Sequence, residues 1–197
     1  LFFSPRGRMR LTDKKSIAGA RAAIDPLLAQ MTLEEKAGQL NQITGTDAVT
    51  GPMLESTAGR SIADEIRAGR IGSFLNAVGV DKVRRLQKIA VEESRLKIPL
   101  VFGFDVIHGY WTTFPLPLAE AASWDLALIE RTARIAAIEA AADGVMWTFA
   151  PMVDIGRDAR WGRVMEGAGE DPYLGSLIAS ARVKGFQGDD LARPDSI

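Results

Sequence analysis

The sequence predicts an α/β fold with parallel strands, and two observations support this. Short apolar runs at 71–76, 99–106 and 145–155 alternate with longer segments in which apolar residues recur at helical spacing. Near-continuous apolar runs are typical of parallel strands that are covered on both faces. Strands that alternate with helices in this way predict βαβ units with right-handed crossovers.

The composition is that of an ordinary globular protein, with 47% hydrophobic and 25% charged residues among 197, which excludes a disordered chain. The 24 Lys and Arg against 25 Asp and Glu leave a net charge of −1, whereas a nucleic-acid binder normally has a basic surplus. The chain has no cysteine and one histidine, His108, which excludes disulfides and a multi-histidine metal site. No run approaches the roughly 18 apolar residues of a membrane span. We therefore expect no cofactor, no metal, no nucleic-acid partner and no membrane partner.

The amino-terminal part of the chain divides into a lead-in and the start of a domain. We expect residues 1–25 to form a loosely ordered lead-in segment and residues 26–197 to form the folded domain. Thr32 followed by Glu35 is a capping box, in which each side chain satisfies a backbone amide of the first helical turn. The helix that it starts is expected to continue over MTLEEKAGQLNQI, and the Gly, Thr and Ser residues of 44–59 predict a loop.

The middle of the chain supplies the first two strands. A short helix is expected at 61–68 and a buried strand at 71–76. Asp81 is expected to cap the following helix, because its carboxylate can accept an amide of the first turn. The run at 99–106 predicts the second strand, and residues 107–122 are expected to form a loop.

The last third of the chain repeats the pattern. A helix is expected at 123–144 with Ser123 as its N-cap, followed by a buried strand at 145–155. Asp171 and Pro172 supply a cap and a first-turn proline to the last helix. Three such units suffice for a small open sheet and are too few for a closed barrel, in which eight units occupy about 250 residues. By pattern alone, the chain is interpreted as a piece of something larger.

Asp105 is the first candidate functional residue. Function in parallel α/β folds gathers at the carboxyl ends of the strands, where the loops converge. Asp105 closes an otherwise apolar run, and a carboxylate that loses water there needs a compensating partner. It either accepts hydrogen bonds from loop amides or binds a polyhydroxylated substrate, and the pattern fits both.

The segment from Asp154 to Arg163 is the second candidate. It holds three arginines, two aspartates and a tryptophan directly after the third apolar run. Arginine offers a rigid fork of donors and tryptophan a flat apolar face, which suit a sugar or an anion. An internally salt-bridged loop is the structural alternative.

Other site chemistries are weak or excluded. The glycines between Glu166 and Pro172 are in the wrong order for a dinucleotide fingerprint, and acidic residues at a helix start repel phosphate. No serine lies in a G-x-S-x-G context, so a nucleophile-elbow hydrolase is unsupported. His108, alone in a loop after a strand, is expected to be a hydrogen-bonded structural residue.

The chain resembles the amino-terminal half of family 3 glycoside hydrolases, and most of all bacterial β-glucosidases, in three segments: MTLEEKAGQL, IPLVFGFDVIHGYWTTFPLPLAEAASWD and FAPMVDIGRDARWGRVMEGAGEDPYLGSLIASARVKGFQG. The similarity covers about residues 25–188, and the combination of RWGR and GEDP after FAP is specific. The resemblance implies an α/β fold that is the amino-terminal part of a (β/α)8 TIM-type barrel, incomplete in this chain.

The resemblance also implies a chemistry. The family hydrolyses β-linked sugars with retention, using an aspartate nucleophile and an acid/base glutamate. The similarity to β-glucosidases implies terminal β-linked glucose in β-glucosides or short β-glucans as the substrate. It implies that Asp105 and Arg163 bind the sugar in the subsite next to the scissile bond. It further implies that Glu166 orients Arg163 from behind, while Asp154 and Asp158 hold the loop.

The resemblance places the bond-breaking groups elsewhere. A Lys-His pair that binds the sugar in the family has no counterpart here, and the nucleophile and the acid/base are expected beyond Ile197. We therefore expect no catalytic residue in this chain, which would be inactive alone and would aggregate unless completed. Its expected partners are a β-glucoside or oligosaccharide substrate and the missing remainder of the enzyme, in the same or a separate chain.

Two alternatives stay open. One is a β-N-acetylhexosaminidase of the same family, against which the RWGR and GEDP motifs weigh. The other is a non-catalytic carbohydrate-binding fragment that keeps Asp105 and Arg163. The compartment is not readable from the residues, and the resemblance alone favours a periplasmic or secreted location.

Overall fold

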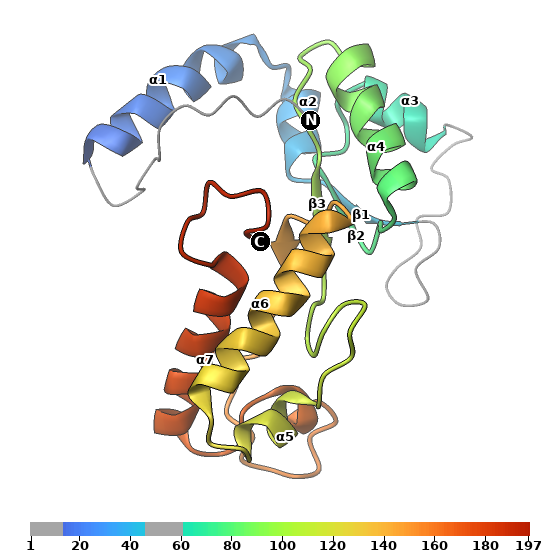
Figure 1. Ribbon diagram of the computed structural model, residues 1–197. Helices are drawn as coiled ribbons and strands as arrows, with labels where there is room; N and C mark the ends of the chain where they lie inside the picture. Colours follow the sequence, from blue (N-terminus) through green and yellow to red (C-terminus); the bar gives the residue numbers. More distant parts are fainter. Residues whose placement is uncertain (1–13, 46–60) are drawn as a thin grey trace.

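The computed structural model describes residues 14–45 and 61–197, which fold around a parallel sheet (Figure 1). The sheet has the strand order β1-β2-β3-β4, and every pair of neighbours is parallel. Ile43, Phe74 and Phe102 lie side by side across the first three strands. The strands are β1 (Gln42–Thr44), β2 (Ser73–Leu75), β3 (Val101–Phe104) and β4 (Trp147–Thr148). Because all four strands are parallel, their carboxyl ends lie at the same end of the sheet.

Helical segments connect the strands and cover the sheet. The α-helices are α1 (Lys14–Gln30), α2 (Leu33–Gln39), α3 (Ile62–Arg67), α4 (Val80–Lys88), α5 (Pro117–Ala121), α6 (Leu126–Ala142) and α7 (Pro172–Gln187). A π-helical turn, η2 (Ile89–Glu93), extends α4, and a 3₁₀ turn, η3 (Val164–Glu166), lies between β4 and α7. Figure 1 shows α6 and α7 packed side by side, with α5 at the end where both helices begin. Within the described residues, no helix combines the length and the apolarity that a membrane crossing requires.

Local capping chemistry explains where the helices begin. The predicted capping box of Thr32 and Glu35 is confirmed, and so is Asp171 as the N-cap of α7, which accepts from the amides of Tyr173 and Leu174. Two predicted caps are wrong by a few residues. Gly79 rather than Asp81 caps α4. Asp125 rather than Ser123 caps α6, because the Asp125 carboxylate accepts from the Leu128 amide, whereas the Ser123 hydroxyl accepts from the amide of Asp125 itself.

Three predicted segments differ from the structure, and a fourth lies mostly outside the described residues. Helix α1 occupies Lys14–Gln30, where a loosely ordered lead-in was expected up to residue 25. The helix from Leu33 ends at Gln39, and β1 follows because Ile43 is buried against β2. Helix α5 lies inside the predicted loop at 107–122, where Pro117 occupies a first-turn position that needs no amide donor. The expected loop at 44–59 lies mostly outside the described residues.

The third predicted strand is the largest error. A buried strand was expected at 145–155, whereas β4 consists of Trp147 and Thr148 alone. Among the described residues, β4 pairs only with β3 and forms the edge of the sheet, so no described strand pairs with its other side. Pro151 has no amide to donate to a ladder, and Val153 is 68% exposed.

The core is divided between the two groups of helices. One buried cluster joins the first three strands to α3 and α4, with Phe74 and Phe102 stacked at 5.7 Å between ring centroids. Two further clusters, one of them mostly alanine, fill the space between α6, α7 and the segment after β3. The alanines allow the two helices to approach closely, and this packing fixes α7 relative to β3.

Candidate functional site

Asp105 lies directly after β3, at the carboxyl edge of the sheet. Its carboxylate is exposed, and within the described residues no loop amide donates to it. The interpretation of Asp105 as an acceptor for loop amides therefore finds no support. The side chain is instead available to a ligand at the place where this fold collects functional groups.

Arg163 and Glu166 form a bidentate ion pair in the loop between β4 and α7. The Arg163 Nε donates to Glu166 Oε1 at 3.0 Å and its Nη2 donates to Glu166 Oε2 at 2.7 Å. The turn η3 brings them together, because it places Glu166 one turn after Arg163. The arginine side chain is 61% exposed and the glutamate 23%, so the carboxylate lies behind the guanidinium.

The electrostatics of this loop connect Arg163 to Asp105. The Glu166 carboxylate raises the pKa of Arg163 above its ordinary value, and the charges of Asp105 and Asp154 add to this effect. In return, Arg163 lowers the pKa of Glu166. The structure thus brings Asp105, at the end of β3, within electrostatic range of Arg163, which lies 58 positions later in the printed sequence.

The rest of the loop is held by its own contacts. Asp158 accepts from the amide and the guanidinium of Arg160 two residues later. The Gly156 amide donates to the Gly169 carbonyl at 2.9 Å, which closes the loop against the segment that precedes α7. An internally salt-bridged loop, the structural alternative, therefore describes Asp158 and Arg160. Arg163 is also paired, with Glu166, but its side chain remains mostly exposed to solvent.

His108 has the hydrogen-bonded structural environment that we expected. Its Nδ1 donates to the Phe114 carbonyl at 3.0 Å, and the Phe114 amide donates to the His108 carbonyl at 2.8 Å. Glu139 of α6 fastens the tip of this loop by accepting from the amides of Trp111 and Thr112 and from the Thr112 hydroxyl. The segment after Asp105 is therefore fixed at its base and at its tip.

Two buried charged residues, Glu120 of α5 and Arg182 of α7, were not predicted from the sequence. Their side chains form an ion pair. The pattern held a signal for Arg182. It shares the buried face of α7 with Ile178, Ala181 and Gly185 at helical spacing, and a charge on such a face requires a buried partner.

The arrangement suits a neutral, hydroxyl-rich ligand. An exposed carboxylate accepts hydroxyl hydrogens, and a guanidinium held by a carboxylate donates to hydroxyl oxygens in a fixed plane. Among the residues that the structure describes, no group of three or more His, Cys, Asp or Glu side chains could hold a metal ion.

Parallel strands in sequential order, with helices between them and polar side chains at their carboxyl ends, are the arrangement of the α/β-barrel class of proteins. Residues 32–194 match the family model described as the glycosyl hydrolase family 3 N terminal domain, and the chain belongs to this family. The fold is accordingly the amino-terminal part of a (β/α)8 barrel, as the family resemblance implied.

Relatives of this chain include β-glucosidases, and β-xylosidases also match. The chain is 43% identical over 171 residues to the periplasmic beta-glucosidase of Salmonella typhimurium, covering 87% of this chain and 21% of that protein. It is 32% identical over 205 residues to the lysosomal beta glucosidase of Dictyostelium discoideum, covering 93% and 25%. The crystal structure of a beta-glucosidase from Listeria innocua in complex with isofagomine matches with a TM-score of 0.81 and 41% identity, covering 90% of this chain and 25% of that one. The chain thus spans about a fifth to a quarter of the length of these relatives.

Proposed function

We propose that this chain is the sugar-binding part of a β-glucosidase that removes terminal β-linked glucose from β-glucosides or short β-glucans. Asp105 accepts hydrogen bonds from sugar hydroxyls in the subsite next to the scissile bond. Arg163 donates to the same sugar, and Glu166 holds its guanidinium in plane. The observation that carries the proposal is the Arg163–Glu166 bidentate pair, held within electrostatic range of an exposed Asp105.

The bond-breaking step belongs to groups outside these 197 residues. Retaining hydrolysis needs a nucleophilic carboxylate and an acid/base carboxylic acid about 5–5.5 Å apart. Glu166 is committed to Arg163 and Asp158 to Arg160, which leaves them bound within the loop. Following the family pattern, which places the nucleophile and the acid/base in other segments, we assign binding and orientation to this chain and no catalytic residue, so that the chain alone is inactive.

The substrate class is tested with the full-length enzyme. We expect it to hydrolyse an aryl β-glucoside faster than the matching aryl β-N-acetylglucosaminide. The reverse order supports a β-N-acetylhexosaminidase of the same family. Binding of glucose without hydrolysis of either substrate supports a non-catalytic carbohydrate-binding protein.

The subsite is tested by Asp105→Asn in the same enzyme. The amide keeps the size of the side chain but replaces one of the two acceptor oxygens with a donor NH2 and removes the charge, so kcat/KM falls while the thermal midpoint stays unchanged. Asp158→Asn is the matched control, since Asp158 pairs with Arg160 inside the loop. A loss of folding with little specific kinetic effect would assign Asp105 a structural role instead.

We also propose a location outside the cytoplasm. The support is the name of the Salmonella relative, a periplasmic enzyme, together with the lysosomal relative from Dictyostelium. Cell fractionation of the native producer, followed by an aryl β-glucoside assay of each fraction, tests it. Activity confined to the cytoplasmic fraction contradicts it.

A further inference from the structure

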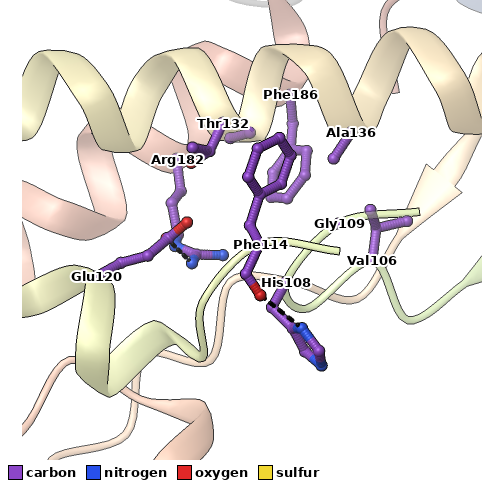
Figure 2. A pocket seen from close by; sticks show the side chains of 10 residues that line it. Val106, His108, Gly109, Phe114, Glu120, Thr132, Ala136, Arg182 and Phe186 are labelled. Atoms are coloured by element: carbon purple, nitrogen blue, oxygen red, sulfur yellow. Dashed lines mark hydrogen bonds and ion pairs between the residues drawn. The ribbon is translucent and has the colours of Figure 1, made fainter. Parts of the chain in front are cut away.

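A buried ion pair lies behind the candidate sugar site. Arg182 of α7 and Glu120 of α5 are 4% and 7% exposed, and the Arg182 Nη2 donates to Glu120 Oε2. Figure 2 shows the two side chains turned toward one another beside a small pocket, which His108 and Phe114 also line. Burial lowers the pKa of Arg182, and the charge of Glu120 opposes that shift.

The same guanidinium holds the segment that follows Asp105. The Arg182 Nη1 donates to the carbonyl of Ile107 at 2.7 Å, two residues after Asp105. Within the described residues, the Nε of Arg182 is buried and has no hydrogen-bond partner. All of its hydrogen bonding therefore goes to Glu120 and Ile107, and the arginine ties α7 to both α5 and the end of β3.

Helix α5 connects the ion pair to the segment that holds Arg163. It packs against η3, the turn that begins directly after Arg163 and ends on Glu166. Leu118 of α5 also lies against Gly169, since a Cβ placed on that glycine would be 3.6 Å from the Leu118 Cδ1. Arg182 thus holds the segment that follows Asp105, and Glu120 lies on the helix that packs against the turn next to Arg163.

Folding alone gives little reason for this pair. Removing two charges from water is costly, and well-packed apolar residues of similar volume often stabilise a protein as much or more. A guanidinium, however, fixes the direction of two acceptors at once in a rigid plane. The pair therefore contributes geometry that an apolar contact would not supply.

We propose that Arg182, together with Glu120, is a positioning residue that sets the separation of Asp105 from Arg163 across the sugar subsite. The inference rests on the proposed function, because it gives both residues a common ligand. Arg182 touches no substrate and acts through the Ile107 carbonyl and through α5.

The test replaces the pair in the full-length enzyme and measures hydrolysis of an aryl β-glucoside. The double variant Arg182→Met with Glu120→Leu removes both charges of the pair, so neither is left buried without its partner, and we expect the thermal midpoint to be preserved. We expect kcat/KM to fall roughly 10- to 100-fold, since small displacements of binding groups have effects of this size. An unchanged thermal midpoint with kcat/KM within about twofold of wild type overturns the proposal.

Arg182→Lys is the second variant, and it decides the question if the double variant does not fold. Lysine keeps the charge opposite Glu120, but its ammonium has no planar fork with which to hold Ile107 as well. A folded Arg182→Lys enzyme with reduced kcat/KM supports the proposal, and full activity overturns it.

A mutant cycle separates positioning from general destabilisation. Combined with Asp105→Asn, the pair replacement should cost much less than the product of the two separate effects, because both act on the same contact with the sugar. Independent, multiplicative effects contradict the proposal. The cycle uses whichever glycoside the wild-type enzyme hydrolyses best, so a wrong substrate assignment shows in the wild-type assay and leaves the cycle readable.

Discussion

The side chain of Arg163 divides its donors between the protein and the solvent. A guanidinium has five N–H donors, and two of these, one on Nε and one on Nη2, are engaged by Glu166. The remaining donors lie on the exposed side, in a plane that the glutamate fixes. A sugar that binds there therefore loses less orientational freedom than it would against a free arginine.

Replacing Arg163 with alanine in the full-length enzyme should lower kcat/KM by a factor that corresponds to about 2–4 kcal/mol, because a charge-assisted donor to the transition state is lost. Arg163→Lys should recover little of this, since an ammonium cannot pair with both oxygens of Glu166 in one plane.

Arg160→Ala is the control for this substitution, because Arg160 lies in the same loop and pairs with Asp158. Its side chain is 90% exposed, and we expect kcat/KM within about twofold of wild type, as for most surface substitutions. Initial-rate kinetics on an aryl β-glucoside measure all three variants. Equal losses for Arg163→Ala and Arg160→Ala would remove Arg163 from the site.

At the scale of elements, the contact between α6 and α7 depends on one glycine. A Cβ at Gly185 would lie 2.3 Å from the Glu130 carbonyl oxygen and 2.6 Å from the Ala133 Cβ. Helix propensity favours alanine over glycine by about 0.8–1 kcal/mol, but overpacking of a close contact costs about 1–3 kcal/mol. We therefore expect Gly185→Ala to lower the free energy of unfolding.

Gly175 supplies the matched control on the same helix. Nothing lies within 4 Å of a Cβ placed there, so Gly175→Ala should gain stability by up to about 1 kcal/mol through propensity alone. Denaturant unfolding of the full-length enzyme measures both variants. A stabilised Gly185→Ala protein would show that α6 and α7 separate at little cost.

The loop after β3 is fastened by a charge and should respond to pH. Hydrogen bonds from Thr112 and from the amides of Thr112 and Trp111 lower the pKa of Glu139. A carboxylate with a lowered folded-state pKa contributes stability that is complete above its unfolded pKa and is lost as the pH falls through the folded value. The anchor should therefore hold at neutral pH and release below the ordinary range of a glutamate.

Amide hydrogen exchange, corrected for the intrinsic rate at each pH, measures this release. Protection of the Trp111 and Thr112 amides should fall on acidification and should already be reduced at neutral pH in Glu139→Gln. Glu130→Gln, an exposed glutamate of the same helix, should leave it unchanged. Protection that does not depend on pH would mean that the backbone of the loop holds itself.

The elements that sequence reasoning located best are those whose ends depend on local chemistry. Thr32 and Asp171 accept backbone amides a few residues away, so their role follows from the adjacent sequence. The short strand β1 could not be located in this way, because Ile43 is in a strand only through its pairing with Phe74 of β2. The length of β4 depends on a neighbouring strand in the same manner.

The site residues also divide into those that could be identified from nearby sequence and those that depend on tertiary contacts. Motifs in the printed sequence pointed to Asp105, Arg163 and Glu166, and the spacing of the last two already allowed a pair across one turn. Glu120 and Arg182 were not identified, since the partner that each buried charge requires lies on another helix. Their 62-residue separation makes the ion pair a property of the tertiary fold.

At the scale of the whole molecule, the edge of the sheet at β4 carries exposed aromatic side chains. Trp147 and Phe149 pack together at 4.6 Å between ring centroids, yet they are 42% and 41% exposed. Gly103 of β3 leaves room for both rings. An edge strand flanked by exposed aromatic residues offers its backbone and its side chains to another surface.

We expect the 197-residue chain, when produced by itself, to associate through this edge. Phe149→Lys with Val153→Lys should reduce the association, because charges on an edge oppose strand pairing and cost energy when they are buried. Leu40→Lys is the control: Leu40 is 89% exposed and follows α2, beside β1 at the opposite edge of the sheet. Sedimentation velocity at several concentrations measures the effect, and β-glucosidase assays of the same samples should detect no hydrolysis. A monomeric wild-type chain, or equal effects of the two kinds of substitution, would show that the β4 edge is not the surface through which this domain assembles.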